Sequence, residues 1–209
     1  MKVSKEKVAE NRAALIDAAR LLLKEKGFDG TSVAEISAKA GLTQGAFYRQ
    51  FATKDELTAI ACRLDLASRC ERWEAESGDR NGALAYIDDY LLYALSQDPT
   101  VNCPLAAYAG EIARQPKNVM AAFADGTAEI AKLMEFSLRK TLFPALARRR
   151  ALFLVTSLAG VVAIARAINP SNPELAREIL NAAAVETKKL ILSPPKKKQA
   201  QGASPSKAA

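Results

Sequence analysis

Apolar residues recur every three or four positions along most of this chain, which is the spacing of helices that bury one face. The first such stripe predicts a helix from about Lys7 to Lys26 that ends at Gly27. Eight further helices are predicted, at about residues 32–40, 44–50, 53–76, 82–98, 104–115, 117–142, 144–169 and 173–192. No segment reads convincingly as a strand. The pattern therefore predicts an all-α fold of about nine helices.

Capping signals divide the segment from Thr31 to Leu57 into short helices. Ser32 and Glu35 have the spacing of a capping box at the start of one helix. Gly41 permits a sharp turn, and Thr43 can cap the helix that follows. Two short helices joined by a tight turn form a helix-turn-helix, whose second helix enters the DNA major groove.

The helix after the turn carries candidate base-reading chemistry. Gly45 costs about 1 kcal/mol against alanine in a helix interior. Together with Ala46, it would let the backbone approach base edges. Gln44 can hydrogen-bond an adenine, and Arg49 a guanine or a phosphate. The alternative is a short solvated helix with a chance glycine.

Three further residues are candidate phosphate contacts. Thr43 and Tyr48 can donate hydroxyl hydrogen bonds that set the register on DNA. Lys54 is expected at the first position of the fourth helix, where the helix dipole disfavours a cation unless an anion binds there. The alternative for Lys54 is a flexible surface lysine.

As a whole, residues from about Leu15 to Leu64 resemble the DNA-binding domain of the TetR family of transcriptional regulators. The likeness is carried by Gly27-Phe28, Thr31-Ser32, Ile36, Ala40-Gly41-Leu42-Thr43, Gly45, Phe47-Tyr48, Phe51, Lys54 and Leu57. Beyond about Arg80 it extends only to helix count and length. The resemblance implies double-stranded DNA as a partner. The expected DNA-contacting set is Ser32, Thr43, Gln44, Gly45, Ala46, Tyr48, Arg49, Gln50 and Lys54. Gln50 stands where many members of the family have histidine. A contact of this residue with the DNA backbone would therefore keep a hydrogen bond without a charge.

The resemblance also implies that helices four to seven enclose a small-molecule effector. Candidate pocket residues are Trp73, Tyr86, Tyr90, Cys103, Tyr108, Met120, Phe123 and Met134. They include hydroxyls and an indole N–H but no charged anchor, so an apolar or aromatic effector is expected. The alternative for each of them is ordinary core packing. A buried, inert thiol is expected at Cys103, with a reactive sensor thiol as the alternative.

The same resemblance pairs the last two helices with a second subunit, giving a homodimer. The expected interface is Leu152, Val155, Ala159, Val162, Ala163, Arg166, Leu175, Ile179, Ala182, Ala183 and Glu186. Twofold pairing would place two heads about 34–36 Å apart and require a near-palindromic operator. The alternative is that these faces complete the core of the monomer.

Charge and composition narrow the functional class. The net charge is +7, with +3 in residues 1–64, zero in 65–192 and +4 in 193–209, so the excess lies at the two ends. The chain has no histidine, which excludes Ser-His-Asp and Cys-His catalysis and the commonest zinc ligand. Its three cysteines form no CxxC pair, which favours a reducing cytoplasmic compartment. No enzymatic activity, metal or cofactor is expected.

No membrane partner is expected either. Met1–Glu10 is charged and has no apolar run typical of a signal peptide. The most apolar segment, Ala151–Ile168, contains Arg166 and is rich in small residues, which favours a buried helix over a membrane span.

The sequence thus predicts a ligand-responsive transcriptional repressor, released from a palindromic operator by a small molecule. Its expected parts are a helix-turn-helix domain at 1–52, a helical effector-binding and dimerisation domain at 53–192, and a disordered basic tail at 193–209. An activator or an effector-independent DNA-binding protein of the same fold remains open. A non-specific DNA-packaging protein that binds through the tail is the other alternative.

Overall fold

Helices account for every regular element in the computed structural model, which describes residues 4–76 and 80–193. This confirms the all-α prediction for the described part of the chain. The predicted basic tail lies, from residue 194 on, outside the described residues. The elements are α1 (Lys5–Lys26), α2 (Val33–Lys39), α3 (Gln44–Tyr48), α4 (Lys54–Glu76), α5 (Arg80–Leu92), α6 (Pro104–Tyr108), a 3-10 turn (Ile112–Arg114), α7 (Lys117–Arg139), α8 (Pro144–Ile168) and α9 (Pro173–Leu192).

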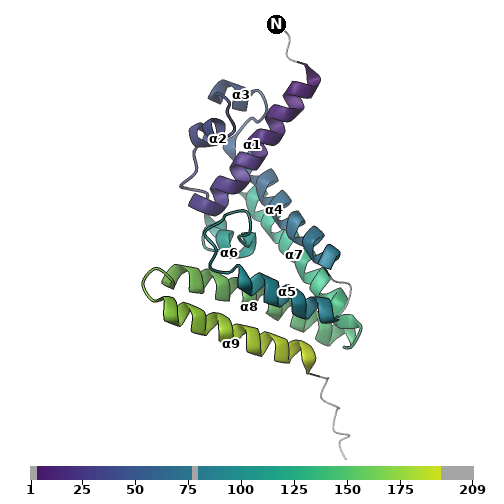
Figure 1. The fold of residues 1–209 in the computed structure, drawn as a ribbon. Helices are drawn as coiled ribbons and strands as arrows, with labels where there is room; N and C mark the ends of the chain where they lie inside the picture. The colour runs from purple at the N-terminus through teal and green to yellow at the C-terminus, as the bar shows by residue number, and fades with distance from the viewer. Residues whose placement is uncertain (1–3, 77–79, 194–209) are drawn as a thin grey trace, which may run out of the picture.

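The helices form a small head and a larger body (Figure 1). The head consists of α1, α2 and α3 at one end of the molecule, and α4 leads from it into the body alongside α7. At the far end α8 and α9 lie antiparallel, with α5 packed against α9. Gly126 allows the close contact of α7 with α4, since a Cβ there would lie 2.6 Å from the side chain of Leu66.

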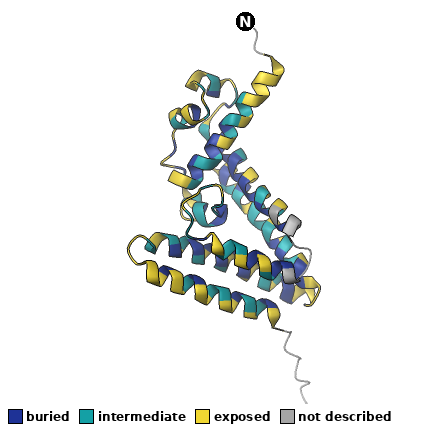
Figure 2. Ribbon diagram, in the orientation of Figure 1, coloured by how far each residue is buried: buried dark blue, intermediate teal, exposed yellow. Residues whose placement is uncertain are grey.

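The core of the head follows from short sequence patterns. The buried residues of α1 are the predicted stripe of Leu15, Ala18, Ala19, Leu22 and Leu23. The capping box of Ser32 and Glu35 is present in both directions, and Gly27 and Gly41 have positive φ angles of 75° and 68°. Phe47 and Phe51 are buried, with ring centroids 5.7 Å apart. They belong to one core cluster with the buried residues of α1, and Figure 2 shows buried positions along the part of α1 that lies in the head.

The connection between α5 and α6 departs from the prediction. The fifth helix ends at Leu92 instead of near Pro99, and turns occupy most of the following segment. Side chains there bond to nearby backbone amides, from Asp98 N to Ser96 Oγ at 3.1 Å and from Thr100 N to Asp98 Oδ1 at 2.8 Å. Such local hydrogen bonds compete with a helix, which explains its early end.

Within the described ranges, α8 is the one helix that is long and apolar enough to cross a membrane by length and composition alone. In the structure it packs against α6, α7 and α9. Ala151, Leu154 and Leu158 are buried in these contacts. Packing within the body thus accounts for the apolar residues on the inner side of α8.

Candidate nucleic-acid interface and small-molecule cavity

The outer face of α3 is exposed, whereas its inner face is held by Phe47. Gln44 and Arg49 are exposed, and no hydrogen bond or ion pair joins their side chains to other described residues. Tyr48 is 60% exposed, and its ring packs edge-to-face with that of Phe47, with centroids 5.2 Å apart. Thr43 caps the helix by accepting from Ala46 N at 3.3 Å. The predicted base-reading residues therefore share one accessible surface.

Gly45 has no structural requirement for glycine. Its φ is not positive, and a Cβ at this position would meet only Thr43 Oγ1, at 3.8 Å. Alanine would fit and would favour the helix by about 1 kcal/mol. A close approach by a molecule outside the chain would explain the glycine.

Like Thr43, three more of the predicted DNA contacts have hydrogen-bond partners within the chain. The Ser32 hydroxyl accepts from Glu35 N at 3.2 Å and donates to the Glu35 carboxylate at 2.9 Å. Gln50 Nε2 donates to the Val8 carbonyl at 3.2 Å. Lys54 Nζ donates to the Phe28 carbonyl at 2.6 Å, so it ties the start of α4 to the loop after α1. The Lys54 ammonium at the beginning of α4 therefore already has a hydrogen-bond acceptor within the chain.

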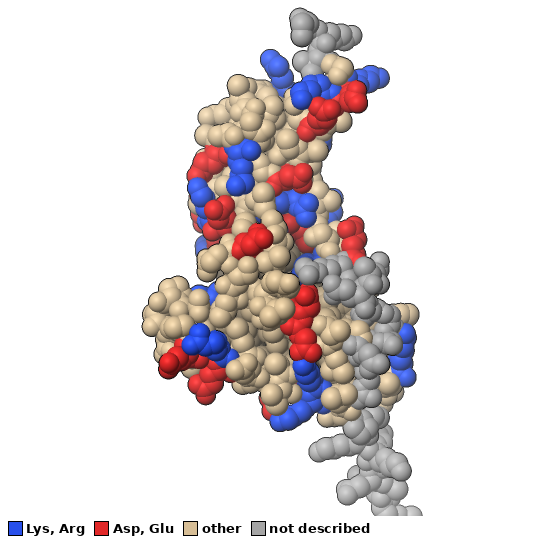
Figure 3. Space-filling model, in the orientation of Figure 1, with Lys and Arg blue, Asp and Glu red and all other residues tan. Residues whose placement is uncertain are grey.

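Charge is sparse at the tip of the head. No residue of α3 is charged, and Figure 3 shows a mostly uncharged surface around it, with acidic and basic side chains elsewhere on the head. Glu35 lies nearby, where the Lys26 ammonium and the Ser32 groups lower its pKa to about 2. An uncharged face suits contact with base edges, with phosphates at its margins.

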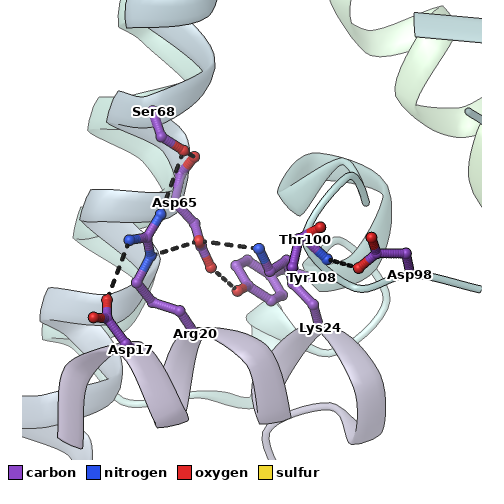
Figure 4. A network of polar contacts seen from close by, with 8 residues as sticks. All are labelled: Asp17, Arg20, Lys24, Asp65, Ser68, Asp98, Thr100 and Tyr108. Carbon is purple, nitrogen blue, oxygen red and sulfur yellow. Dashed lines mark hydrogen bonds and ion pairs between the residues drawn. The ribbon is translucent and has the colours of Figure 1, made fainter. Parts of the chain in front are cut away.

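A buried carboxylate joins the head to the body (Figure 4). Asp65 of α4 is 1% exposed, and its Oδ1 accepts from Arg20 Nε at 2.8 Å and pairs with Lys24 Nζ at 3.3 Å. Its Oδ2 accepts from the Tyr108 hydroxyl at 2.5 Å. Burial, and then the Asp65 charge, raise the pKa of Tyr108 well above 10. Three helices, α1, α4 and α6, therefore meet at this one side chain.

A second carboxylate fixes the same junction from the segment after α6. Glu111 Oε2 accepts from Phe28 N at 2.8 Å and from Asp29 N at 3.4 Å. Gly27 makes room for it, since a Cβ there would lie 2.0 Å from Glu111 Oε1. Phe28 also meets the Tyr108 ring edge-on, with centroids 5.1 Å apart.

A small cavity of about 20 Å³ lies in the body, one to two turns of α4 beyond this junction. It has room for about one water molecule. Helices α4 to α8 all contribute to its wall. The lining residues are Arg69, Trp73, Tyr86, Tyr90, Cys103, Leu105, Ile130, Met134, Val155 and Leu158.

Five of the predicted pocket residues lie together in this wall, namely Trp73, Tyr86, Tyr90, Cys103 and Met134. The other three do not line it. Tyr108 is fully buried at the junction with the head. Met120 and Phe123 precede Met134 on α7 by 14 and 11 residues, a rise of about 16 Å or more.

Arg69 is the charged lining residue that sequence reasoning missed. Its position four residues before Trp73 on α4 places both on one face of that helix, which was a usable signal. The same proximity bears on Cys103. No cation is adjacent to it in sequence, yet Arg69 lines the same cavity.

The predicted dimer face of α8 is partly wrong. Val155, Ala159 and Val162 are at most 9% exposed and pack inside the subunit. Arg166 also points inward, where its Nε donates to the Ala94 carbonyl at 2.6 Å and its Nη2 to Asn102 Oδ1. A helix that is apolar on all sides gives no periodic signal for its outer face, which explains the error.

The outer face of α8 and α9 is nevertheless apolar. Phe153 and Ile164 are 59% and 57% exposed on α8, and Val185 is 51% exposed on α9. Of the remaining predicted residues, Leu152, Leu175, Ala182 and Glu186 are exposed, and Ala163, Ile179 and Ala183 are half-buried. In the part of the chain that the structure describes, no group of three His, Cys, Asp or Glu residues is placed to hold a metal ion.

The structure thus has an accessible helix-turn-helix in its head and a larger all-helical body, which places the protein in the class of helix-turn-helix proteins. The family model described as "Bacterial regulatory proteins, tetR family" matches residues 15–59. The head of this chain therefore matches the DNA-binding domain of that family. The Transposon Tn10 TetC protein of Escherichia coli is 42% identical over 53 residues, which are 25% of this chain and 27% of that protein. The match thus spans about a quarter of that relative.

Solved structures extend the likeness to the body. Reduced NemR of E. coli has a TM-score of 0.72 at 21% identity, over 86% of this chain and 95% of that one. A TetR transcriptional regulator from Chloroflexus aurantiacus has a TM-score of 0.72 at 21% identity, over 90% of this chain and 98% of that one. At such identities the likeness shows the fold.

Proposed function

We propose that this protein is a homodimeric transcriptional repressor, which binds a near-palindromic operator and releases it when a small molecule enters the body. The single observation that carries DNA reading is the exposed face of α3, with a glycine that the fold does not need. The proposal places the protein in the cytoplasm and gives it no enzymatic activity.

The outer face of α8 and α9 supports the dimer. Phe153, Ile164 and Val185 leave an apolar surface that a twofold mate would cover in a four-helix seam. Two heads on one dimer would dock on successive major grooves, so the affinity depends on the distance between them.

Helix α6 supports the coupling of the cavity to the head. Cys103 and Leu105 at its beginning line the cavity, and Tyr108 at its end bonds Asp65 and touches Phe28. A cavity with room for about one water must widen to admit an effector. Widening would shift α4 and α6 against α1 and change the spacing of the heads.

Gly45→Ala tests the DNA-binding surface. We expect unchanged or higher thermal stability, since alanine is the better helix former, but loss of about tenfold or more in affinity for a DNA selected from a random pool. Fluorescence anisotropy with that DNA measures the affinity. Gly110→Ala is the control, because a Cβ there would meet nothing within 4 Å and Gly110 lies outside α3. Equal affinities of Gly45→Ala and wild type would remove α3 from the interface.

Titration of a releasing compound with and without operator DNA tests the coupling. Linkage requires that the operator weaken the binding of the compound by the same factor by which the compound weakens operator binding. Equal affinities for the compound in the two titrations would exclude an effector mechanism and leave an effector-independent regulator.

A further inference from the structure

Arg69 is a buried cation that has no role in the proposed function as described above. It is 9% exposed in the cavity wall. Its Nη2 donates to the Tyr86 hydroxyl at 2.7 Å, and its guanidinium carbon lies 5.2 Å and 5.3 Å from the ring centroids of Tyr86 and Tyr90. Phenol and ring faces are thus its partners.

No acid pairs with Arg69 among the described residues. None of the ion pairs in the described ranges includes it. Arginine remains protonated in proteins, and a buried charge is costly unless it is paired. One neutral hydrogen bond and two ring faces offset only part of that cost.

The surroundings of Arg69 favour an anion on its polar side. A second cavity, of about 10 Å³, is lined by Arg69, Arg166 and Asp89, so two guanidinium groups face one carboxylate there. Arg166 donates to Ala94 O and Asn102 Oδ1, neither of which is charged. The net charge of this wall is positive.

The other side of Arg69 is apolar and aromatic. The first cavity shares Arg69, Tyr90 and Cys103 with the second, and the rest of its wall includes Trp73 and Leu158. A ligand that spans both cavities would meet an apolar surface at one end and the guanidinium at the other.

We propose that the effector is a small organic acid, with its aromatic or alkyl body among the apolar side chains and its carboxylate paired with Arg69. The inference rests on the proposed effector-released function and replaces the expectation of an effector without a charged anchor. The planar guanidinium has donors beyond the one that binds Tyr86, and it can take a carboxylate through two parallel hydrogen bonds.

Trp73, the one tryptophan of the chain, reports directly on this site. It lies in the cavity wall, with its ring centroid 4.2 Å from that of Tyr86. The probes are 4-butylbenzoate, cyclohexanecarboxylate and decanoate, each titrated beside its primary amide. We expect at least one acid to change Trp73 fluorescence with a Kd about tenfold or more below that of its amide, as for a charge-assisted hydrogen bond.

Arg69→Met should raise the Kd of that acid about tenfold or more and leave that of the amide nearly unchanged. Arg63→Met, which removes an exposed arginine from the same helix, is the matched control and should leave both values unchanged. If Arg69→Met does not fold, Arg69→Gln serves as a second neutral variant. The comparison of acid with amide in the wild-type protein needs no variant at all.

Three results would overturn the inference: equal affinities for acid and amide, acid binding that survives Arg69→Met, or binding by none of the three acids. The wild-type protein is also assayed with its selected DNA. If amides bind the protein and release that DNA, the regulatory function stands, but the proposal of an organic acid as effector is wrong. If no DNA is selected, the regulatory function falls whatever the acids do.

Discussion

Asp65 and Arg69 lie four residues apart on α4, both buried, yet their surroundings are opposite. Asp65 accepts from Arg20 and Tyr108 and pairs with Lys24, so its charge is compensated from two other helices. Arg69 meets a phenol and ring faces, with no acid among the described residues. A saturated buried charge holds elements together, whereas an unsaturated one remains available to a ligand.

On the same helix, Asp65 thus forms a joint between helices, whereas Arg69 lies at the proposed ligand-binding site. The Asp65 joint holds α1 and α6 to α4. In the proposed mechanism, a change in the body would reach the head through it. The Arg69 wall lies about one turn farther into the body, where a ligand would act. Each of the following three variants removes one part of this arrangement.

The largest effect is expected for Asp65→Ala. It leaves Arg20, Lys24 and the Tyr108 hydroxyl without their common partner, and breaking such a buried set costs about 3–5 kcal/mol. The melting temperature should fall by about 10 °C in a chain of this size. Asp17→Ala is the control, since Asp17 is 69% exposed and 3.6 Å from Arg20. Its effect should stay within about 1 kcal/mol. Equal melting temperatures for Asp65→Ala and wild type would contradict the joint.

A smaller loss, about 1.5–3 kcal/mol, is expected for Tyr108→Phe at neutral pH, since one hydrogen bond to a charged group is removed. Its pH dependence has a definite sign. The folded-state pKa of Tyr108 is raised above 10 by burial and by Asp65, so this stability is present below about pH 10. As the pH rises above 10, the unfolded chain ionises first and the stability is lost.

Chemical denaturation between pH 8 and 11 measures this slope. Tyr108→Phe should lose less stability than wild type over that interval. Burial also raises the pKa of Tyr90, and that of Cys62 to about 12, so part of the slope remains in both proteins. Tyr48→Phe, at the exposed face of α3, is the control. Parallel slopes for Tyr108→Phe and wild type would show that Tyr108 does not hold its proton in the joint.

The head could be predicted from sequence because its determinants are local. The Ser32–Glu35 capping box spans four residues, and the Gly41 turn and the Thr43 cap are single-residue signals. The stripe on α1 needs only one helix to be recognised. Family resemblance added the DNA-facing set, yet it gave no sign that Lys54 Nζ bonds to the Phe28 carbonyl, 26 residues away.

The body depends on contacts that no local pattern contains. Asp65 meets partners 45 and 43 residues away, so neither its burial nor the position of Tyr108 at the joint follows from spacing. Aromatic identity selected Tyr108 as a pocket residue but cannot tell which side of α6 it faces. On α8, buried Val162 and exposed Ile164 are both apolar. Only packing distinguishes them.

The smallest effect, and the one of opposite sign, is expected for Arg69→Met. Methionine removes a buried cation that has no acid partner while it keeps much of the side-chain volume, so stability should be unchanged or higher by about 1 kcal/mol. Thermal unfolding without ligand measures it. Arg20→Met is the matched control, because it takes a donor from Asp65 and should lower the melting temperature. A loss above about 2 kcal/mol for Arg69→Met would mean that Arg69 is structural in the way Asp65 is. The difference between the joint and the ligand wall would then disappear.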